Sequence, residues 1–188
     1  LRFISGGSGM VDVLNLDNSS RFQIVRSTEM LAQSTDILIV DVPAGASDAT
    51  LNFVGAADRP LIILVGEPTS FMDAYSLIKA AFLEADIKHF YLAVNMANSE
   101  AQAHDHFSRF RDITSRFLDV QLTYVGHIPY SNALRQSVIE RKPIMTRPDP
   151  SRETIAFQKI SKSLLSGPLN RTNGIRYLGA PSTQETVS

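Results

Sequence analysis

The chain has 188 residues, of which 44% are apolar and 20% are charged, so it is long enough and apolar enough to bury one sizeable core. Its 18 lysines and arginines are balanced by 19 aspartates and glutamates, and the net charge of −1 supplies no broad positive field for general nucleic-acid binding. The absence of cysteine excludes disulfides, a thiolate nucleophile and a zinc–thiolate site, which fits a reducing cytoplasm and leaves stability to the packed core.

The sequence carries no signal for a membrane. No apolar run approaches the roughly 20 residues that cross a bilayer, and the stretch after Gly167 contains no amphipathic helix with a basic face. Membrane association is therefore not evident in this chain, and we expect a cytoplasmic protein. The chain opens with Leu1 instead of methionine, inside sequence that already looks structured, so we also expect that an upstream segment has been removed.

Short aliphatic runs alternate with longer stretches of helical periodicity, which is the pattern of strand–helix units around a parallel sheet. In chain order the expected elements are strand 1–5, helix 21–34, strand 36–42, helix 47–56, strand 61–65, helix 70–85, strand 89–95, helix 99–118, strand 120–128, helix 132–140 and helix 151–165. We predict an α/β fold, a three-layer sandwich with a mainly parallel sheet.

Three of the strands, at 36–42, 61–65 and 89–95, are aliphatic almost throughout, as strands buried on both faces should be. The helix at 70–85 is expected to be capped by Thr69 or Ser70. Its apolar side chains recur at intervals of three and four and predict a stripe facing the core: Phe71, Ala74, Tyr75, Ile78, Ala81 and Phe82. After Gly167 the apolar periodicity stops, so we divide the chain into a domain at 1–166 and a flexible tail at 167–188.

Candidate chemistry is sought at the carboxyl ends of the strands, where open parallel sheets bind ligands. Asp41 closes the aliphatic run at 36–42, and Gly45 follows four positions later in a loop of small residues. Phosphate-hydrolysing proteins use such an aspartate to hold Mg²⁺ through a water and such a loop to aim an amide at a terminal phosphate. The alternative is that Asp41 starts a turn or caps the next helix.

Two further strand ends point to a nucleotide base. Asn95 and Met96 close the strand at 89–95, and an amide side chain there can either bond an adenine edge or cap a helix. Ile128, Pro129 and Tyr130 follow the strand at 120–128, where the proline stiffens a loop whose backbone could contact a base.

Seven basic residues stand against three acidic ones between Arg135 and Lys162. Such a local excess is consistent with a solvated surface or with a docking face for an acidic protein partner.

In this order, four stretches resemble the MinD/ParA family of deviant P-loop ATPases, and its FlhG/FleN-like flagellar branch in particular. They are DILIVDVPAG at 36–45, GEPTSFMDAYSLIK at 66–79, YLAVNMANS at 91–99 and VGHIPYSNALRQSVIERKPIM at 125–145. The second is similar to the loop and helix typical of the flagellar branch. The resemblance implies a P-loop NTPase-like fold over about residues 1–165.

The resemblance also implies roles. Asp41 would organise Mg²⁺ and Gly45 would sense the γ-phosphate, while Asn95 would read adenine and Met96 beside it would belong to the ATP-binding site. The loop at 128–130 would line the base. The implied function is an ATP-dependent switch that controls the number or placement of a cellular structure such as flagella, dimerises on ATP, hydrolyses it slowly and releases a protein partner.

One departure from the family concerns the phosphates. The glycine-rich Walker A loop with its lysine is absent, and the segment from Gly6 to Met10 lacks both the lysine and the Ser/Thr that would hold Mg²⁺. We expect a missing upstream unit of about 30 residues and predict that this polypeptide alone neither holds ATP tightly nor hydrolyses it. The alternatives are a non-catalytic binding module and a chromosome- or plasmid-partitioning relative, which would need a basic DNA-binding surface.

Overall fold

The computed structural model describes residues 35–148 and 150–170. The elements predicted at 1–5 and 21–34 therefore lie outside the described residues. The described elements are α2 (Asp48–Ala56), β1 (Leu61–Val65), α3 (Pro68–Ala85), β2 (His89–Ala97), α4 (Glu100–Thr114), β3 (Gln121–Pro129), α5 (Asn132–Ile139), the short 3₁₀ helix η1 (Ile144–Thr146) and α6 (Arg152–Ser166).

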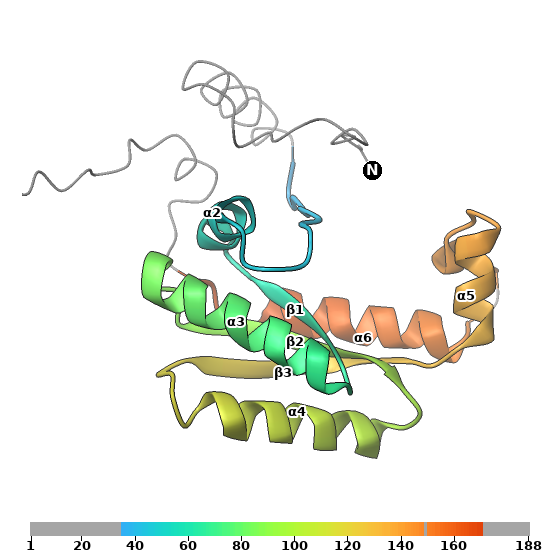
Figure 1. The fold of residues 1–188 in the computed structure, drawn as a ribbon. Helices are drawn as coiled ribbons and strands as arrows, with labels where there is room; N and C mark the ends of the chain where they lie inside the picture. The colour runs from blue at the N-terminus through green and yellow to red at the C-terminus, as the bar shows by residue number, and fades with distance from the viewer. Residues whose placement is uncertain (1–34, 149, 171–188) are drawn as a thin grey trace, which may run out of the picture.

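The sheet has the order β1-β2-β3, and both strand pairs are parallel. Helices α3 and α4 cover one face of the sheet, and α6 covers the other (Figure 1). The predicted α/β fold with three layers and a parallel sheet is thus confirmed. Because each strand is followed by a helix that returns the chain to the same end, all three strands finish at one edge of the sheet.

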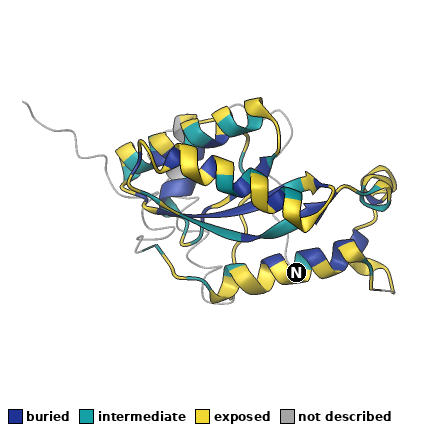
Figure 2. Ribbon diagram, turned by 90° about the horizontal axis from the view of Figure 1, so that it is seen from below, coloured by how far each residue is buried: buried dark blue, intermediate teal, exposed yellow. Residues whose placement is uncertain are grey.

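The central strand β2 divides its side chains between two cores. Phe90, Leu92 and Val94 pack under α3 and α4, whereas Tyr91 and Ala93 pack under α6. All five are fully buried, and Figure 2 shows β2 dark along most of its length. This alternation follows from the two-residue period of a strand, and it explains why the run at 89–95 has apolar residues at nearly every position.

The stripe predicted on the helix at 70–85 is confirmed. Ala74, Ile78 and Ala81 are buried in the first core, and Phe71, Tyr75 and Phe82 pack against its margin.

The start of this helix, by contrast, was predicted two residues too late. Pro68 occupies its first turn and Glu67 is the N-cap, without a side-chain capping bond. Ser70 does not cap the helix, because its hydroxyl accepts a hydrogen bond from the Val65 amide at 3.0 Å and thereby closes the end of β1.

The strand predicted at 36–42 is wrong. Residues 37–43 form neither helix nor strand, and the side chains of Ile37, Leu38, Ile39 and Val40 are exposed, Ile39 to 86%. A strand exists only where a neighbour pairs with its backbone. Among the described residues, no strand pairs with this segment, and β1 is paired along one edge only. The aliphatic composition indicates a tendency to form a strand, but it does not show whether a neighbouring strand is present to pair with the backbone.

Strand β3 carries a β-bulge in its middle. Tyr124 lies opposite Leu92 and Gly126 lies opposite Ala93, so Val125 is the extra residue. Gly126 has φ +138°, a conformation that side chains rarely adopt, and a Cβ added there would lie 2.9 Å from Ile160 Cγ1 on α6. The bulge therefore brings β3 and α6 into close contact.

Residues 167–170, which the sequence placed at the start of a tail, are bonded to the folded body. Arg59 Nη2 donates to the Gly167 carbonyl at 3.1 Å, and the Tyr91 hydroxyl donates to the Pro168 carbonyl. Asn170 donates from its backbone to Asp58 O and from its side chain to His89 O, each at 2.9 Å. The rest of the expected tail lies outside the described residues.

In the part of the chain that the structure describes, no helix has both the length and the apolar content needed to cross a membrane.

Candidate functional site

The carboxyl ends of the strands bring the two predicted base-binding stretches together. In the register of the sheet, Asn95 lies opposite Val65 on one side and Ile128 on the other. Ala97 lies opposite Pro129, and the Tyr130 amide donates to Ala97 O at 3.0 Å. We call this edge, formed by residues 95–97 and 128–130, the rim. Stretches predicted separately at the ends of two strands are thus neighbours in the fold.

Asn95 and Met96 lie in the last part of β2, where the register of the strand shifts between Asn95 and Ala97. Asn95 Oδ1 accepts a hydrogen bond from the Met96 amide at 2.9 Å, and Met96 has the left-handed φ of +59°. Met96 is 58% exposed. An amide oxygen has a second lone pair and an amide nitrogen has two donor hydrogens, so Asn95 retains the capacity to bond a ligand from this position. Asn95 does not cap α4, because Ser99 is the N-cap of that helix.

The loop predicted at 128–130 is mostly strand, because Ile128 and Pro129 are the last two residues of β3 and only Tyr130 follows it. Ile128 and Pro129 are buried, and Ile128 belongs to the core under α6. Tyr130 is 54% exposed, so its ring is available for contact with a flat ligand while its backbone is bonded to β2.

Asp41 and Gly45 do not belong to this cluster. Both are exposed in the segment that leads into α2, which lies beside α2 and away from the point where β1 ends and α3 begins (Figure 1). Gly45 has φ +104°. Ser47, not Asp41, caps α2, accepting from the Thr50 amide at 3.3 Å. The structure therefore brings Asn95, Met96 and the 128–130 loop together and leaves Asp41 and Gly45 apart from them.

The residues present fit part of a Mg²⁺–ATP complex. The rim offers an amide, backbone groups and a tyrosine ring, which suit a purine base. Among the described residues there is no group of three metal-binding side chains. Protein-bound Mg²⁺ usually has one or two carboxylate ligands and completes its coordination with phosphate oxygens and water, and Asp41 fits the part of such a carboxylate.

Arg152 of α6, which the sequence did not indicate as a site residue, contacts the rim, and its neighbour Glu153 pairs with it. Arg152 Nη2 donates to the Tyr130 carbonyl at 2.7 Å, and Arg152 Nε donates to Glu153 Oε1 at 3.0 Å. The Glu153 side chain is only 6% exposed. The pattern Ser151-x-x-Thr154 at the start of α6 is visible in the sequence and forms a capping box. Nothing local in the sequence shows that Glu153 turns inward.

The carboxylate of Glu153 is held ionised by its hydrogen bonds. A bond from the Ser131 hydroxyl is the largest influence, and with further bonds from Ser151, the Glu153 backbone and Arg152 it outweighs the opposing effect of burial, lowering the pKa to about 2. A carboxyl group whose pKa is lower in the folded state stabilises the fold above its unfolded pKa, near 4.5, and loses that contribution as the pH falls towards 2.

We therefore expect the free energy of unfolding to fall between about pH 4.5 and pH 2, and Glu153→Gln to flatten this part of the profile. The variant should cost roughly 1–3 kcal/mol at pH 7, because hydrogen bonds to a charge are lost. Urea titrations at several pH values measure both effects. Glu140→Gln, which alters an exposed carboxylate bonded to Gln136, is the matched control and should leave the profile close to wild type. An unchanged acid limb in Glu153→Gln would contradict the prediction.

Comparison with known proteins agrees with the resemblance seen in the sequence. No family model matches the chain. The antiactivator FleN of Pseudomonas aeruginosa is 31% identical to it over 169 residues, which are 90% of this chain and 60% of FleN. The chain resembles proteins of the MinD/ParA type. Among these it is similar to the flagellar branch, since the flagellum site-determining protein YlxH of Helicobacter pylori is 27% identical over 76% of the chain and 48% of YlxH.

The MinD side of the family is represented by a putative septum site-determining protein MinD of Oltmannsiellopsis viridis, 28% identical over 79% of the chain and 48% of that protein. The MinD cell division protein of Aquifex aeolicus shares the fold, with a TM-score of 0.63, 22% identity and coverage of 82% of this chain and 64% of that structure. The chain thus spans between about half and three fifths of the curated relatives it matches.

Proposed function

We propose that this MinD/ParA-type chain is the base-binding part of an ATP-dependent switch that controls the number or placement of a cellular structure, most directly flagella. The observation that carries the proposal is the register that sets Asn95 beside Ile128 at the rim, with Tyr130 bonded to Ala97. The names of its relatives, FleN and the flagellum site-determining YlxH, support the flagellar assignment. We further propose a cytoplasmic location.

In this proposal each rim residue has one task. Asn95 pairs with the edge of adenine, the backbone at Met96 and at 128–130 surrounds the base, and the Tyr130 ring covers it. Asp41 holds Mg²⁺ through water and Gly45 contacts the γ-phosphate once the phosphates are in place. Bound Mg²⁺–ATP would supply the cleavable γ-phosphate, and its binding would favour a homodimer that engages a protein partner. The Walker A motif is not among these 188 residues, so we expect this polypeptide by itself to bind adenine nucleotides weakly.

The test of the base site is Asn95→Ala. It should weaken adenosine binding and leave the binding of inorganic phosphate unchanged, because only the base loses a bonding partner. Titrations followed by NMR amide shifts measure both ligands. Asn98→Ala is the matched control, since Asn98 is an exposed amide three residues further along the same loop. Equal weakening of adenosine and phosphate would mean that Asn95 is only structural.

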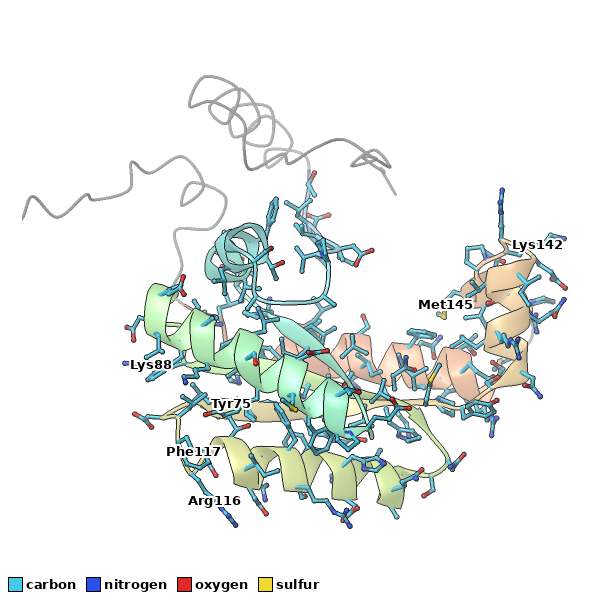
Figure 3. All side chains as sticks on the ribbon, viewed as in Figure 1. Tyr75, Lys88, Arg116, Phe117, Lys142 and Met145 are labelled. Carbon is cyan, nitrogen blue, oxygen red and sulfur yellow. The ribbon has the colours of Figure 1, made fainter. Side chains whose placement is uncertain are left out.

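A second candidate function is a non-catalytic binding module that keeps the fold and a partner surface. It is favoured by the outer side of α5, where Val138 is 73% and Ile139 64% exposed. Arg135 lies three and four residues before them, on the same side of the helix, and Lys142 extends from the helix end (Figure 3). Such a surface suits an acidic protein partner, and its binding should weaken with salt.

Asp41→Ala separates the two functions. In any form of the protein that turns over ATP, the variant should abolish Mg²⁺-dependent turnover, because the ion loses its protein ligand. In a pure binding module it should leave partner affinity unchanged. Phosphate release measures the first effect, and Asp58→Ala, a change at another exposed aspartate, serves as the control. Turnover that survives Asp41→Ala would contradict the role given to Asp41.

The third alternative, a chromosome- or plasmid-partitioning relative, is disfavoured by the net charge of −1, which gives no broad positive field for DNA.

A further inference from the structure

The turn after β3, at residues 130 and 131, is hydrogen-bonded to the first turn of α6. Tyr130 and Ser131 lie between β3 and α5, and Arg152 and Glu153 approach them from a helix that starts about 20 residues later.

Arg152 holds the turn with two bonds from one rigid group. Its side chain is 65% exposed, yet Nη2 donates to Tyr130 O and Nε donates to Glu153 Oε1. The planar guanidinium fixes the angle between these two bonds, which a lysine could not do. The amide of Tyr130 meanwhile donates to Ala97 O, so the Tyr130 backbone is bonded on both sides, to β2 and to α6.

Glu153 holds the other half of the turn. A carboxylate that is almost fully buried must be paired, because burying an unpaired charge costs several kcal/mol. The Ser131 hydroxyl lowers the pKa of Glu153 more than any other group does, and Ser131 Oγ accepts a hydrogen bond from the Leu134 amide at 3.2 Å as the N-cap of α5.

We propose that Arg152 and Glu153 are positioning residues that hold Tyr130 and Ser131 in the conformation that lines the nucleotide base at the rim. The inference rests on the proposed function for the identity of the ligand. The effect of Arg152 and Glu153 on the conformation of Tyr130 and Ser131 can be tested without any ligand. Neither residue is expected to touch the base; they act through the Tyr130 carbonyl and the Ser131 hydroxyl.

The first experiment measures amide hydrogen exchange in Arg152→Ala and Glu153→Gln. Exchange at the Tyr130 and Leu134 amides should become about tenfold faster, equivalent to about 1.4 kcal/mol of local opening, while exchange at Leu92 in β2 should not change. Arg109→Ala is the matched control, because it removes an equally exposed arginine paired with Asp105 on α4. Exchange at Tyr130 and Leu134 that matches the control in both variants would overturn the proposal.

Arg152→Lys tests whether the planar guanidinium group, with its two hydrogen bonds, or only the positive charge is needed to hold Tyr130. A single ammonium group does not reproduce the two fixed bonds, so exchange at Tyr130 should stay fast. Full restoration by lysine would contradict the geometric role given to Arg152. Because Arg152 is mostly exposed, these two arginine variants are expected to fold even if Glu153→Gln does not.

The second experiment compares adenosine with guanosine by NMR titration. Wild type should prefer adenosine, with amide shifts at residues 95–97 and 128–130. The ratio of the dissociation constants for guanosine and adenosine should fall towards one in Arg152→Ala but not in Arg109→Ala. If wild type binds neither nucleoside, the proposed base site fails, while the exchange data still decide whether α6 positions the turn. If wild type prefers adenosine and Arg152→Ala keeps that preference, the positioning role fails and the base site stands.

Discussion

Phe110→Ala should lower the free energy of unfolding by about 3–5 kcal/mol, the usual cost of removing a large aromatic side chain from a core. Phe110 is only 1% exposed and lies on the inner side of α4. Its ring meets that of Phe71 edge to face, with 5.4 Å between centroids and an angle of 77°. The contact joins α3 to α4, so removal of the Phe110 ring would leave a cavity where both helices pack on the sheet.

Urea unfolding monitored by circular dichroism measures this effect. Phe117→Ala is the matched control: Phe117 follows the same helix, is 71% exposed and extends from the fold beside Arg116 (Figure 3). The control should change stability by no more than about 0.5 kcal/mol. A loss below about 1 kcal/mol in Phe110→Ala would mean that the core under α4 is far looser than the burial indicates.

Gly126→Ala should cost about 2–4 kcal/mol for two separable reasons. A side chain at φ +138° strains the backbone by about 1–3 kcal/mol, and a Cβ placed 2.9 Å from Ile160 Cγ1 forces β3 and α6 apart. Both costs fall on the core that contains Ile128, so the variant should also disturb the rim.

Gly45→Ala separates the two costs. Gly45 has φ +104°, but no atom of the described residues lies within 4 Å of a Cβ built there, so we expect this variant to carry mainly the backbone strain. In a double-mutant cycle, Ile160→Ala should reduce the cost of Gly126→Ala towards that of Gly45→Ala. If the cost of Gly126→Ala were the same with and without Ile160, the contact with α6 would have no part in it.

Periodicity predicted the elements that are stabilised by their own neighbours. The stripe on α3 and the alternation along β2 depend on side chains within one element, so the positions of Ile78 and Leu92 in the core could be predicted from local spacing. The segment at 36–42 has the same aliphatic composition, but strand formation depends on a second backbone. No local pattern contains that information.

The rim was predicted in part for a related reason. The ends of parallel strands meet at one edge whatever their sequence, so Asn95 and the 128–130 loop could be expected to be neighbours once the strands were placed. The contact of Arg152 with Tyr130 joins residues 22 positions apart through a helix start whose orientation the sequence does not reveal. A buried glutamate is also rare enough that composition argues against it.

The attachment of residues 167–170 also bears on the order in which the fold assembles. Asn170 bonds to Asp58 and His89, and Arg59 bonds to Gly167, so these contacts close loops of 81 to more than 100 residues. Loop closure over such lengths costs conformational entropy that the shorter strand–helix–strand connections avoid. We expect the sheet and its nearer helices to form first and the contacts of residues 167–170 to form last. These contacts would then be absent from the folding transition state, so they would leave the folding rate unchanged and slow unfolding.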